Sequence, residues 1–261
     1  TATTEIYTLF PTRRSSDLYM KKYALFWSYF ADLTGGMIRL DNLHSSHEGF
    51  ITELLEEIRR TYPNLAVTAE FFTDSNTILK KAAEWQINLF LANQWEYPYA
   101  ENLRNYIRYI HDIGRKVRFY LPLTTHDTGA PAQLFGKAEA AVSRYAVTAL
   151  MGTGQTGIVQ GTEHGYPEKI NFMGRKDKYR FPENTGITEG IRTVNRLLGS
   201  SPVFHQAGNL EWIDNGHGAV LGALRRSDKP GDQGYLIFAN LDIQNPYAFA
   251  VDLSSLIKAR D

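Results

Sequence analysis

The sequence has no cysteine among its 261 residues, which excludes disulfides and thiolate chemistry but leaves the cellular compartment open. It has no run of about 18 apolar residues, so we expect no membrane span. Net charge is also absent, because Lys plus Arg equal Asp plus Glu at 28 each. Nucleic acids and anionic membranes require a basic patch, so neither is expected as a partner.

Hydrophobic residues make up 43% of the chain and aromatic residues 13%. This content is enough for a sizeable core and predicts a globular protein rather than a disordered one.

Residues 1–18, TATTEIYTLFPTRRSSDL, lack hydrophobic periodicity and do not begin with Met. TATTEIYTL and FPTRRSSDL resemble a sequencing adapter translated in two adjoining frames, and a genuine polar tail is the alternative. We interpret residues 1–18 as an artefactual tail and exclude them from fold reasoning. The protein proper is then expected to start near Tyr19, in mid-gene.

From residue 19 to residue 200, short apolar runs alternate with amphipathic segments. This alternation is typical of parallel βαβ units and therefore of an α/β fold. The predicted strands are 36–41, 65–70, 87–92, 117–123 and 157–161, and the predicted helices are 21–33, 47–62, 75–85, 100–114, 137–151 and 188–199. The first helix carries Leu25, Phe26, Tyr29, Phe30 and Leu33 on one face and stops at two glycines.

The composition changes at Ser200-Ser201-Pro202, and residues 201–261 read as an antiparallel β domain. Its predicted strands are AVLGALRRS, GYLIFANLD and FAVDLSSL, separated by Asp-Asn-Gly and Pro-Gly turns. Residues 19–200 form the other predicted domain, with five strand–helix units. A closed eight-stranded barrel needs three more strands, so an upstream portion is expected to be missing.

Acidic side chains follow three of the predicted strands. They are Asp41 in GMIRLDNLH, Glu70 in LAVTAEFF and Asp127 in FYLPLTTHD. An acid at the end of a buried strand costs desolvation unless something uses it. Three such acids, separated by helices, indicate a catalytic set on the strand tips of an α/β barrel.

Each acid also has a plainer interpretation. Asp41 with Arg39 can be a buried ion pair, Glu70 an acid near a helix N-cap, and Asp127 an Asx-turn residue. The occurrence of all three at equivalent strand ends favours the catalytic interpretation over three coincidences.

At these motifs the chain resembles the α-amylase superfamily, glycoside hydrolase family 13, over roughly residues 19–260. GMIRLDNLH resembles its strand-four motif, AEFF its strand-five motif, TTHD its strand-seven motif, and GIVQGTEHG its strand-eight segment. The resemblance implies the C-terminal part of a (β/α)8 TIM barrel, about strands 4–8, followed by part of a small antiparallel β domain. It further implies a retaining α-glycoside hydrolase or transglycosidase that acts on α-glucans or oligosaccharides without cofactor or metal.

The resemblance also implies the role of each acid. Asp41 would be the nucleophile, kept ionised by Arg39. Glu70 would be the proton donor and then the base, so it must stay protonated near neutral pH. Asp127 would grip sugar hydroxyls beside His126, which donates a hydrogen bond.

Further residues are candidates for sugar binding. Trp95 and Tyr97 follow the strand 87–92 on the expected active-site side, although such aromatics more often pack in a core or rim. His44 can line an acceptor subsite or be a turn histidine. Glu163, near the strand-eight segment, is interpreted as a structural acid.

The residues that follow Asp41 depart from the common family pattern. Asn42-Leu43-His44 resembles instead the branch of maltosyltransferases that extend α-glucans from maltose 1-phosphate. A catalytically silent carbohydrate-binding relative and a truncated, non-functional gene model are the other hypotheses. The chain as written is expected to be inactive, because an open half-barrel exposes strand edges.

Two patterns invite other functions. GTGQTG at residues 152–157 matches a dinucleotide fingerprint, but here a helix precedes it and a strand follows, the reverse of the required order. His44, His47 and Glu48 suggest a metal site without a fourth ligand. We interpret their segment as a solvated loop in which Ser46 caps the next helix.

Overall fold

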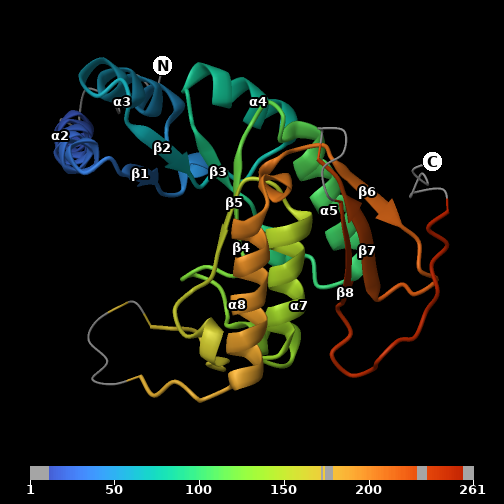
Figure 1. The fold of residues 1–261 in the computed structure, drawn as a ribbon. Coiled ribbons are helices and arrows are strands. Elements are labelled where there is room, and N and C mark those ends of the chain that lie inside the picture. Colours follow the sequence, from blue (N-terminus) through green and yellow to red (C-terminus); the bar gives the residue numbers. More distant parts are fainter. Residues whose placement is uncertain (1–11, 172, 174–178, 228–233, 255–261) are drawn as a thin grey trace, which may run out of the picture. The chain divides into compact units, whose positions relative to one another are not determined.

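The computed structural model describes residues 12–171, 173, 179–227 and 234–254, so eleven residues of the 1–18 segment lie outside the description. The chain divides between Leu91 and Ala92 into two compact units, each of which is described by itself. In both units short parallel strands alternate with helices (Figure 1). Within the described ranges, no helix is both long and apolar enough to cross a membrane.

The first unit contains a parallel sheet in the order β1–β2–β3. In the first strand pair, Met37 lies opposite Ala66 and Leu40 opposite Ala69. Its elements are α2 (Thr12–Leu33), β1 (Met37–Leu40), η1 (Leu43–Ser45), α3 (Glu48–Thr61), β2 (Ala66–Ala69), α4 (Ser75–Glu84) and β3 (Leu89–Leu91). The sequence predicted all three strands and all three α-helices, because apolar periodicity is a local signal.

Helix α3 buries one apolar stripe, made of Ile51, Leu54, Leu55 and Ile58. These residues recur at the spacing of one helix face and supply much of the core of the first unit. The expectation that Ser46 caps this helix is wrong, because the helix starts one residue later than that would require. His47 is the N-cap, and its Nδ1 accepts a hydrogen bond from the Phe50 amide at 3.4 Å.

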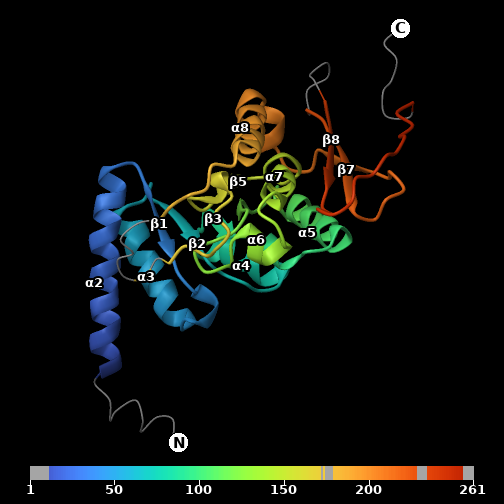
Figure 2. The ribbon, with the colours of Figure 1, turned by 90° about the horizontal axis from the view of Figure 1, so that it is seen from below.

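Helix α2 lies along β1 and α3 (Figure 2). It begins at Thr12, within the segment interpreted as an artefactual tail, so it is longer than the helix predicted over residues 21–33. Its small residues Ala24 and Ser28 face inward, and Ser28 is fully buried. The apolar face seen in the sequence therefore points largely to solvent: Phe26, Tyr29, Phe30 and Leu33 are all exposed.

The second unit contains the parallel pair β4–β5 and an antiparallel sheet in the order β6–β7–β8. Figure 1 shows α7 and α8 packed side by side. The helices are η2 (Gln94–Glu96), α5 (Ala100–Ile113), α6 (Pro131–Phe135), α7 (Ala140–Ala146), the π-helix η3 (Val147–Met151), η4 (Thr162–His164), α8 (Thr185–Ser200) and η5 (Pro202–His205). The strands are β4 (Phe119–Pro122), β5 (Gln155–Gly157), β6 (Leu210–Ile213), β7 (Val220–Arg225) and β8 (Tyr235–Asn240).

Three expectations for the second unit need correction. The helix predicted over 137–151 is two elements, α7 and a fully buried π-helix. The strand predicted over 157–161 lies earlier, because β5 is Gln155–Gly157. FAVDLSSL is not a strand over residues 249–254, and its last two residues lie outside the description. Alternating hydrophobicity indicates a strand only where a neighbouring strand is available to pair with it.

Residues 152–154 join a helix to a strand, as predicted, whereas residues 155–157 of the glycine-rich segment form strand β5 itself. Gly154 has a φ of 99°, and a Cβ at this position would collide with the backbone of Phe119 on β4. The glycine is therefore required by the close approach of two backbone segments.

The guanidinium of Arg225 on β7 connects the antiparallel sheet to the helices of the second unit. Arg225 is fully buried, and its acceptors among the described residues are oxygens of uncharged groups. The acceptors are the backbone carbonyls of Leu150, Gly152, Val203, Phe204 and Gln206 and the side-chain oxygen of Asn209. Burial lowers the pKa of Arg225 to about 9, so the group stays charged at neutral pH.

Candidate active site

Asp41 and Glu70 follow directly on two neighbouring strands of the first unit. Leu40, the last residue of β1, lies opposite Ala69, the last residue of β2. The pairing continues past the strand ends, since the Glu70 amide donates to the Leu40 carbonyl at 3.0 Å. The two acids therefore leave the same edge of the sheet from adjacent, parallel chains.

A single guanidinium contacts both acids. Arg39 Nη1 lies 2.5 Å from Asp41 Oδ1, and Arg39 Nη2 lies 3.2 Å from Glu70 Oε2. Glu70 Oε2 also accepts from the Asn42 amide at 3.1 Å. One guanidinium and two carboxylates therefore lie together at the ends of the adjacent strands β1 and β2.

The acids differ in their access to solvent. The Asp41 side chain is 69% exposed, whereas that of Glu70 is 16% exposed. The interpretation of Arg39 and Asp41 as a buried ion pair is therefore wrong. Glu70 is not a capping acid either, because Asp74 caps helix α4. The two acids therefore differ in exposure while they share one cationic partner.

His44 lies in η1, three residues after Asp41. Its Nδ1 accepts from the Phe72 amide at 3.5 Å, and the two rings lie 5.6 Å apart. Phe72 follows Glu70 by two residues, so His44 is tied to the segment that carries the second acid. The imidazole remains exposed to solvent.

Arg39 and Asp41 also line an open hollow of about 640 Å³ within the first unit. Helix α2 contributes aromatic walls, and α3 contributes apolar ones. The lining includes Tyr23, Trp27, Phe30, Phe50 and Leu54.

His126 and Asp127 lie together in the loop after β4, in the second unit. His126 Nε2 is 3.1 Å from Asp127 Oδ2, and the two side chains are 47% and 55% exposed. The loop's internal hydrogen bonds use threonines, since Asp127 N donates to Thr125 Oγ1 at 3.2 Å and Thr125 N donates to Thr128 Oγ1 at 3.0 Å. The carboxylate of Asp127 faces solvent beside the imidazole.

Trp95 and Tyr97 occupy η2 and the residue after it, and both are half-buried. The Tyr97 ring stacks on Tyr106 with 4.6 Å between centroids, and burial raises the pKa of the Tyr97 hydroxyl. The Tyr97 carbonyl accepts from Arg144 Nη1. One face of the Tyr97 ring therefore packs against Tyr106.

Glu163 lies in η4. Its Oε2 accepts from the Gly161 amide at 2.8 Å, and its carbonyl accepts from Thr188 Oγ1 at 2.7 Å. These contacts tie Glu163 to its own turn and to α8. Lys169, which no sequence pattern singled out, contacts the His126–Asp127 loop through its Nζ.

The candidate residues thus form two clusters. In the first unit Arg39 contacts both Asp41 and Glu70, and His44 follows Asp41 by three residues. His126 and Asp127 form a pair in the second unit, where Trp95 and Tyr97 also lie.

Solved structures with a similar fold include amylases and debranching enzymes. A noncanonic maltogenic α-amylase from Thermotoga neapolitana matches with a TM-score of 0.68 and 15% identity, over 92% of this chain and 57% of its own. An acarbose-soaked debranching enzyme from Nostoc punctiforme matches with a TM-score of 0.63, 18% identity and coverages of 87% and 52%. An acarbose-complexed α-amylase from Geobacillus thermoleovorans matches with a TM-score of 0.65, 13% identity and coverages of 87% and 53%.

No family model matches the sequence, and no curated protein matches it either. The chain spans about half the length of these solved structures. At such identities the likeness shows the fold alone. The fold is α/β, the C-terminal part of a (β/α)8 barrel followed by part of a small antiparallel β domain, as the sequence predicted.

Proposed function

We propose that this chain is the C-terminal half of a retaining α-glycoside hydrolase or transglycosidase that acts on α-glucans. The contact of Arg39 with both Asp41 and Glu70, at the carboxyl ends of adjacent parallel strands, carries this proposal. Active sites of α/β barrels are built at this end of the strands. The fold likeness to amylases and debranching enzymes supports the same class of reaction.

The spacing of the two acids favours retention of configuration. Neighbouring strands lie about 4.8 Å apart, and the two carboxylates share one guanidinium. Retaining enzymes hold their carboxyl groups about 5–5.5 Å apart, whereas inverting enzymes need about 6.5–9.5 Å to admit a water between them. The guanidinium that contacts both carboxylates supports the closer class for the pair Asp41 and Glu70.

In the proposed reaction Asp41 attacks the anomeric carbon and forms a glycosyl ester, while the glycosidic bond breaks. Glu70 gives its proton to the departing oxygen. In the second step Glu70 removes a proton from water or from a sugar hydroxyl, and that oxygen displaces Asp41. Arg39 keeps Asp41 ionised and ready to attack. Water yields hydrolysis, and a sugar acceptor yields transfer.

The second cluster would hold the sugar. Asp127 and His126 offer an acceptor and a donor to ring hydroxyls, which assists distortion of the ring. Trp95 offers an aromatic surface, and His44 would line the acceptor side. Acarbose in two of the similar structures supports an oligosaccharide as the ligand class.

The activity would belong to a longer protein of which this chain is one part. The chain corresponds to about half of each similar structure. Alone, it would lack part of the sugar site, and we expect no catalysis from it.

The experiment uses the full-length gene product with an α-glucan substrate. Asp41→Asn should lower kcat/KM by ~10³-fold or more, which is about 4 kcal/mol of transition-state stabilisation. Proton NMR should detect a product that keeps the α configuration. In Glu70→Gln, an activated glycosyl donor should leave an ester adduct on the peptide that contains Asp41, detectable by mass spectrometry. Inversion of configuration, or full activity in Asp41→Asn, would refute the proposal.

A maltosyltransferase that uses maltose 1-phosphate is the alternative. The fixed position of His44 beside the acid pair favours it, because Asp-Asn-x-His typifies that branch. Release of phosphate from maltose 1-phosphate would support this activity, and starch cleavage without phosphate release would exclude it. A catalytically silent relative would bind oligosaccharide without turnover, yet such relatives usually lose one of the acids retained here.

A further inference from the structure

The loop after β4 is held internally by threonine side chains. Thr128 Oγ1 accepts from the Thr125 amide at 3.0 Å and donates to the Thr125 carbonyl at 3.1 Å. The Asp127 amide in turn donates to Thr125 Oγ1 at 3.2 Å. Short hydroxyl-to-backbone bonds of this kind define the shape of a turn. They do not fix the turn relative to its surroundings.

One residue from a distant segment fixes the loop from outside. Lys169 Nζ donates to the Asp127 carbonyl at 2.7 Å, and the Lys169 amide donates to Gln133 Oε1 at 2.8 Å. The same Gln133 oxygen accepts from the Ala130 amide at 2.9 Å, at the end of the loop. Lys169 therefore ties the loop at its middle and at its junction with α6.

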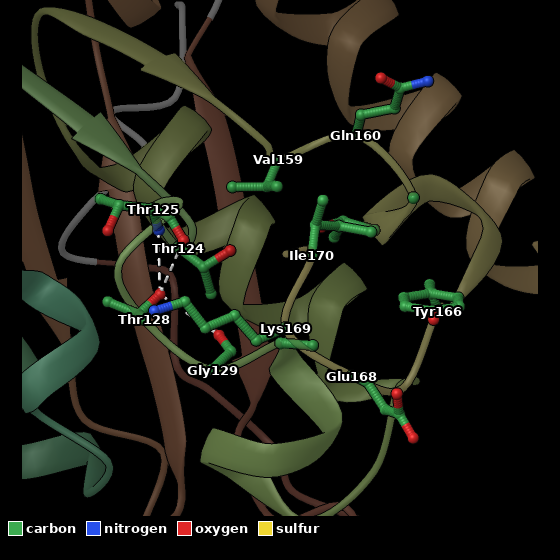
Figure 3. A pocket seen from close by; sticks show the side chains of 13 residues that line it. Thr124, Thr125, Thr128, Gly129, Val159, Gln160, Tyr166, Glu168, Lys169 and Ile170 are labelled. Carbon is green, nitrogen blue, oxygen red and sulfur yellow. Dashed lines mark hydrogen bonds between the residues drawn. The ribbon is translucent and has the colours of Figure 1, made fainter. Parts of the chain in front are cut away.

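The space between the two segments is small. Figure 3 shows Lys169 beside Thr128 and Gly129, with Val159 and Ile170 above them in this view. The residual cavity has a volume of about 10 Å³, which is roughly the room that one water needs. The hydrogen bond from Lys169 Nζ to the Asp127 carbonyl opposes movement of the loop away from Lys169.

We propose that Lys169 is a positioning residue that orients Asp127 for the sugar. The inference rests on the proposed function, in which Asp127 grips sugar hydroxyls. A cationic donor on the Asp127 carbonyl restrains the backbone rotation that directs the adjacent carboxylate. Lys169 acts through Asp127 and makes no contact with the reacting atoms.

The kinetic test compares Lys169→Met and Lys169→Arg in the full-length protein with an α-glucan substrate. Met keeps the chain length without a donor, and Arg keeps a cationic donor. We expect Lys169→Met to lower kcat/KM about ten-fold, mainly in kcat, without a change in Tm, and Lys169→Arg to recover most of the loss. Lys116→Met, at an exposed lysine of the same unit, is the matched control and should behave as wild type.

A double-mutant cycle separates positioning from general structure. In an Asp127→Asn background, Lys169→Met should have little further effect, because its target is already lost. Additive losses, or a Lys169→Met enzyme within two-fold of wild type, would overturn the inference.

The second measurement needs no activity. In the present chain, Lys169→Met should accelerate hydrogen exchange at the amides of Asp127 and Thr128, which bond within the loop. Unchanged exchange would overturn the positioning role. A wild-type full-length protein without α-glucan activity would instead refute the proposed function, so the two failures are distinguishable.

Discussion

Arg39 and Glu70 are joined by an ion pair of 3.2 Å between the neighbouring parallel strands β1 and β2. The same guanidinium also contacts Asp41, so one cation contacts two acids that are separated by 29 residues in the sequence. Without it, Asp41 and Glu70 would lose the cation that both side chains contact.

The first prediction concerns that guanidinium. In the full-length protein, Arg39→Met should lower kcat/KM for an α-glucan by about 100-fold, about 2.7 kcal/mol, because the acids lose their common partner. Arg60→Met is the matched control, since Arg60 is exposed on α3 and contacts Glu57 at 3.6 Å. Its activity should stay at the wild-type level. An Arg39→Met enzyme within three-fold of wild type would contradict the role of this residue.

The second prediction concerns the buried Arg225. Arg225→Met should reduce the free energy of unfolding by about 3 kcal/mol or more, because several buried carbonyl oxygens would lose their donors at about 1–3 kcal/mol each. Urea denaturation followed by circular dichroism measures the change. Arg226→Met, one residue further on and 47% exposed, should stay within about 0.5 kcal/mol of wild type. Equal effects of the two substitutions would show that the buried hydrogen bonds contribute little.

The third prediction concerns pH. His111 Nδ1 accepts from the Gly208 amide at 2.9 Å, so the ring proton sits on Nε2 and is donated to the Met151 carbonyl at 2.8 Å. Burial, with the nearby charge of Arg225, lowers the pKa of His111 to about 4 from an ordinary 6.5. The neutral ring therefore fits the site, and a second proton would break the bond from Gly208.

The sign of the pH effect follows from linkage. Between pH 6.5 and 4 the unfolded chain binds a proton that folded His111 does not, so stability falls as the pH falls through this window. A difference of ~2.5 pKa units corresponds to about 3 kcal/mol, all of it present at pH 7. Urea unfolding at pH 7 and pH 4.5 measures the loss, which His111→Gln should reduce. His205→Gln, at an exposed histidine, should keep the wild-type slope; a slope that is the same in all three proteins would exclude His111 as its source.

The fourth prediction concerns the exposed aromatic face of α2. Trp27 is 50% exposed and Phe30 is 42% exposed, and a continuous apolar patch of this kind promotes association. We expect the purified chain to associate as its concentration rises, measured by light scattering. Trp27→Ser combined with Phe30→Ser should weaken the association without lowering Tm. Tyr99→Ser, at an isolated aromatic that is 73% exposed, should leave it unchanged. If the double variant associates as strongly as wild type, the face is not responsible.

Local patterns in the sequence were sufficient for most of the secondary structure and for the acids. Helix α3 was predicted because its apolar residues repeat at helical spacing, and Asp41 and Glu70 were found because each ends an apolar run. Errors arose where the local pattern was ambiguous. The helix expected at 137–151 is α7 followed by a π-helix, the strand expected at 157–161 is β5 at Gln155–Gly157, and FAVDLSSL has no strand over its described residues.

The sequence by itself determined most of the order of strands and helices, the positions of Asp41 and Glu70 at strand ends and of Asp127 after β4, and the resemblance of their motifs, because these are properties of residues close together in the chain. Only the tertiary structure decided which groups meet. The Lys169 contact with Asp127 spans 42 residues, and that of His111 with Gly208 spans 97. The outward face of α2 likewise depends on packing through Ala24 and Ser28. Periodicity is local, but hydrogen-bond partners and buried faces are set by which segments pack together, and no short-range pattern encodes that choice.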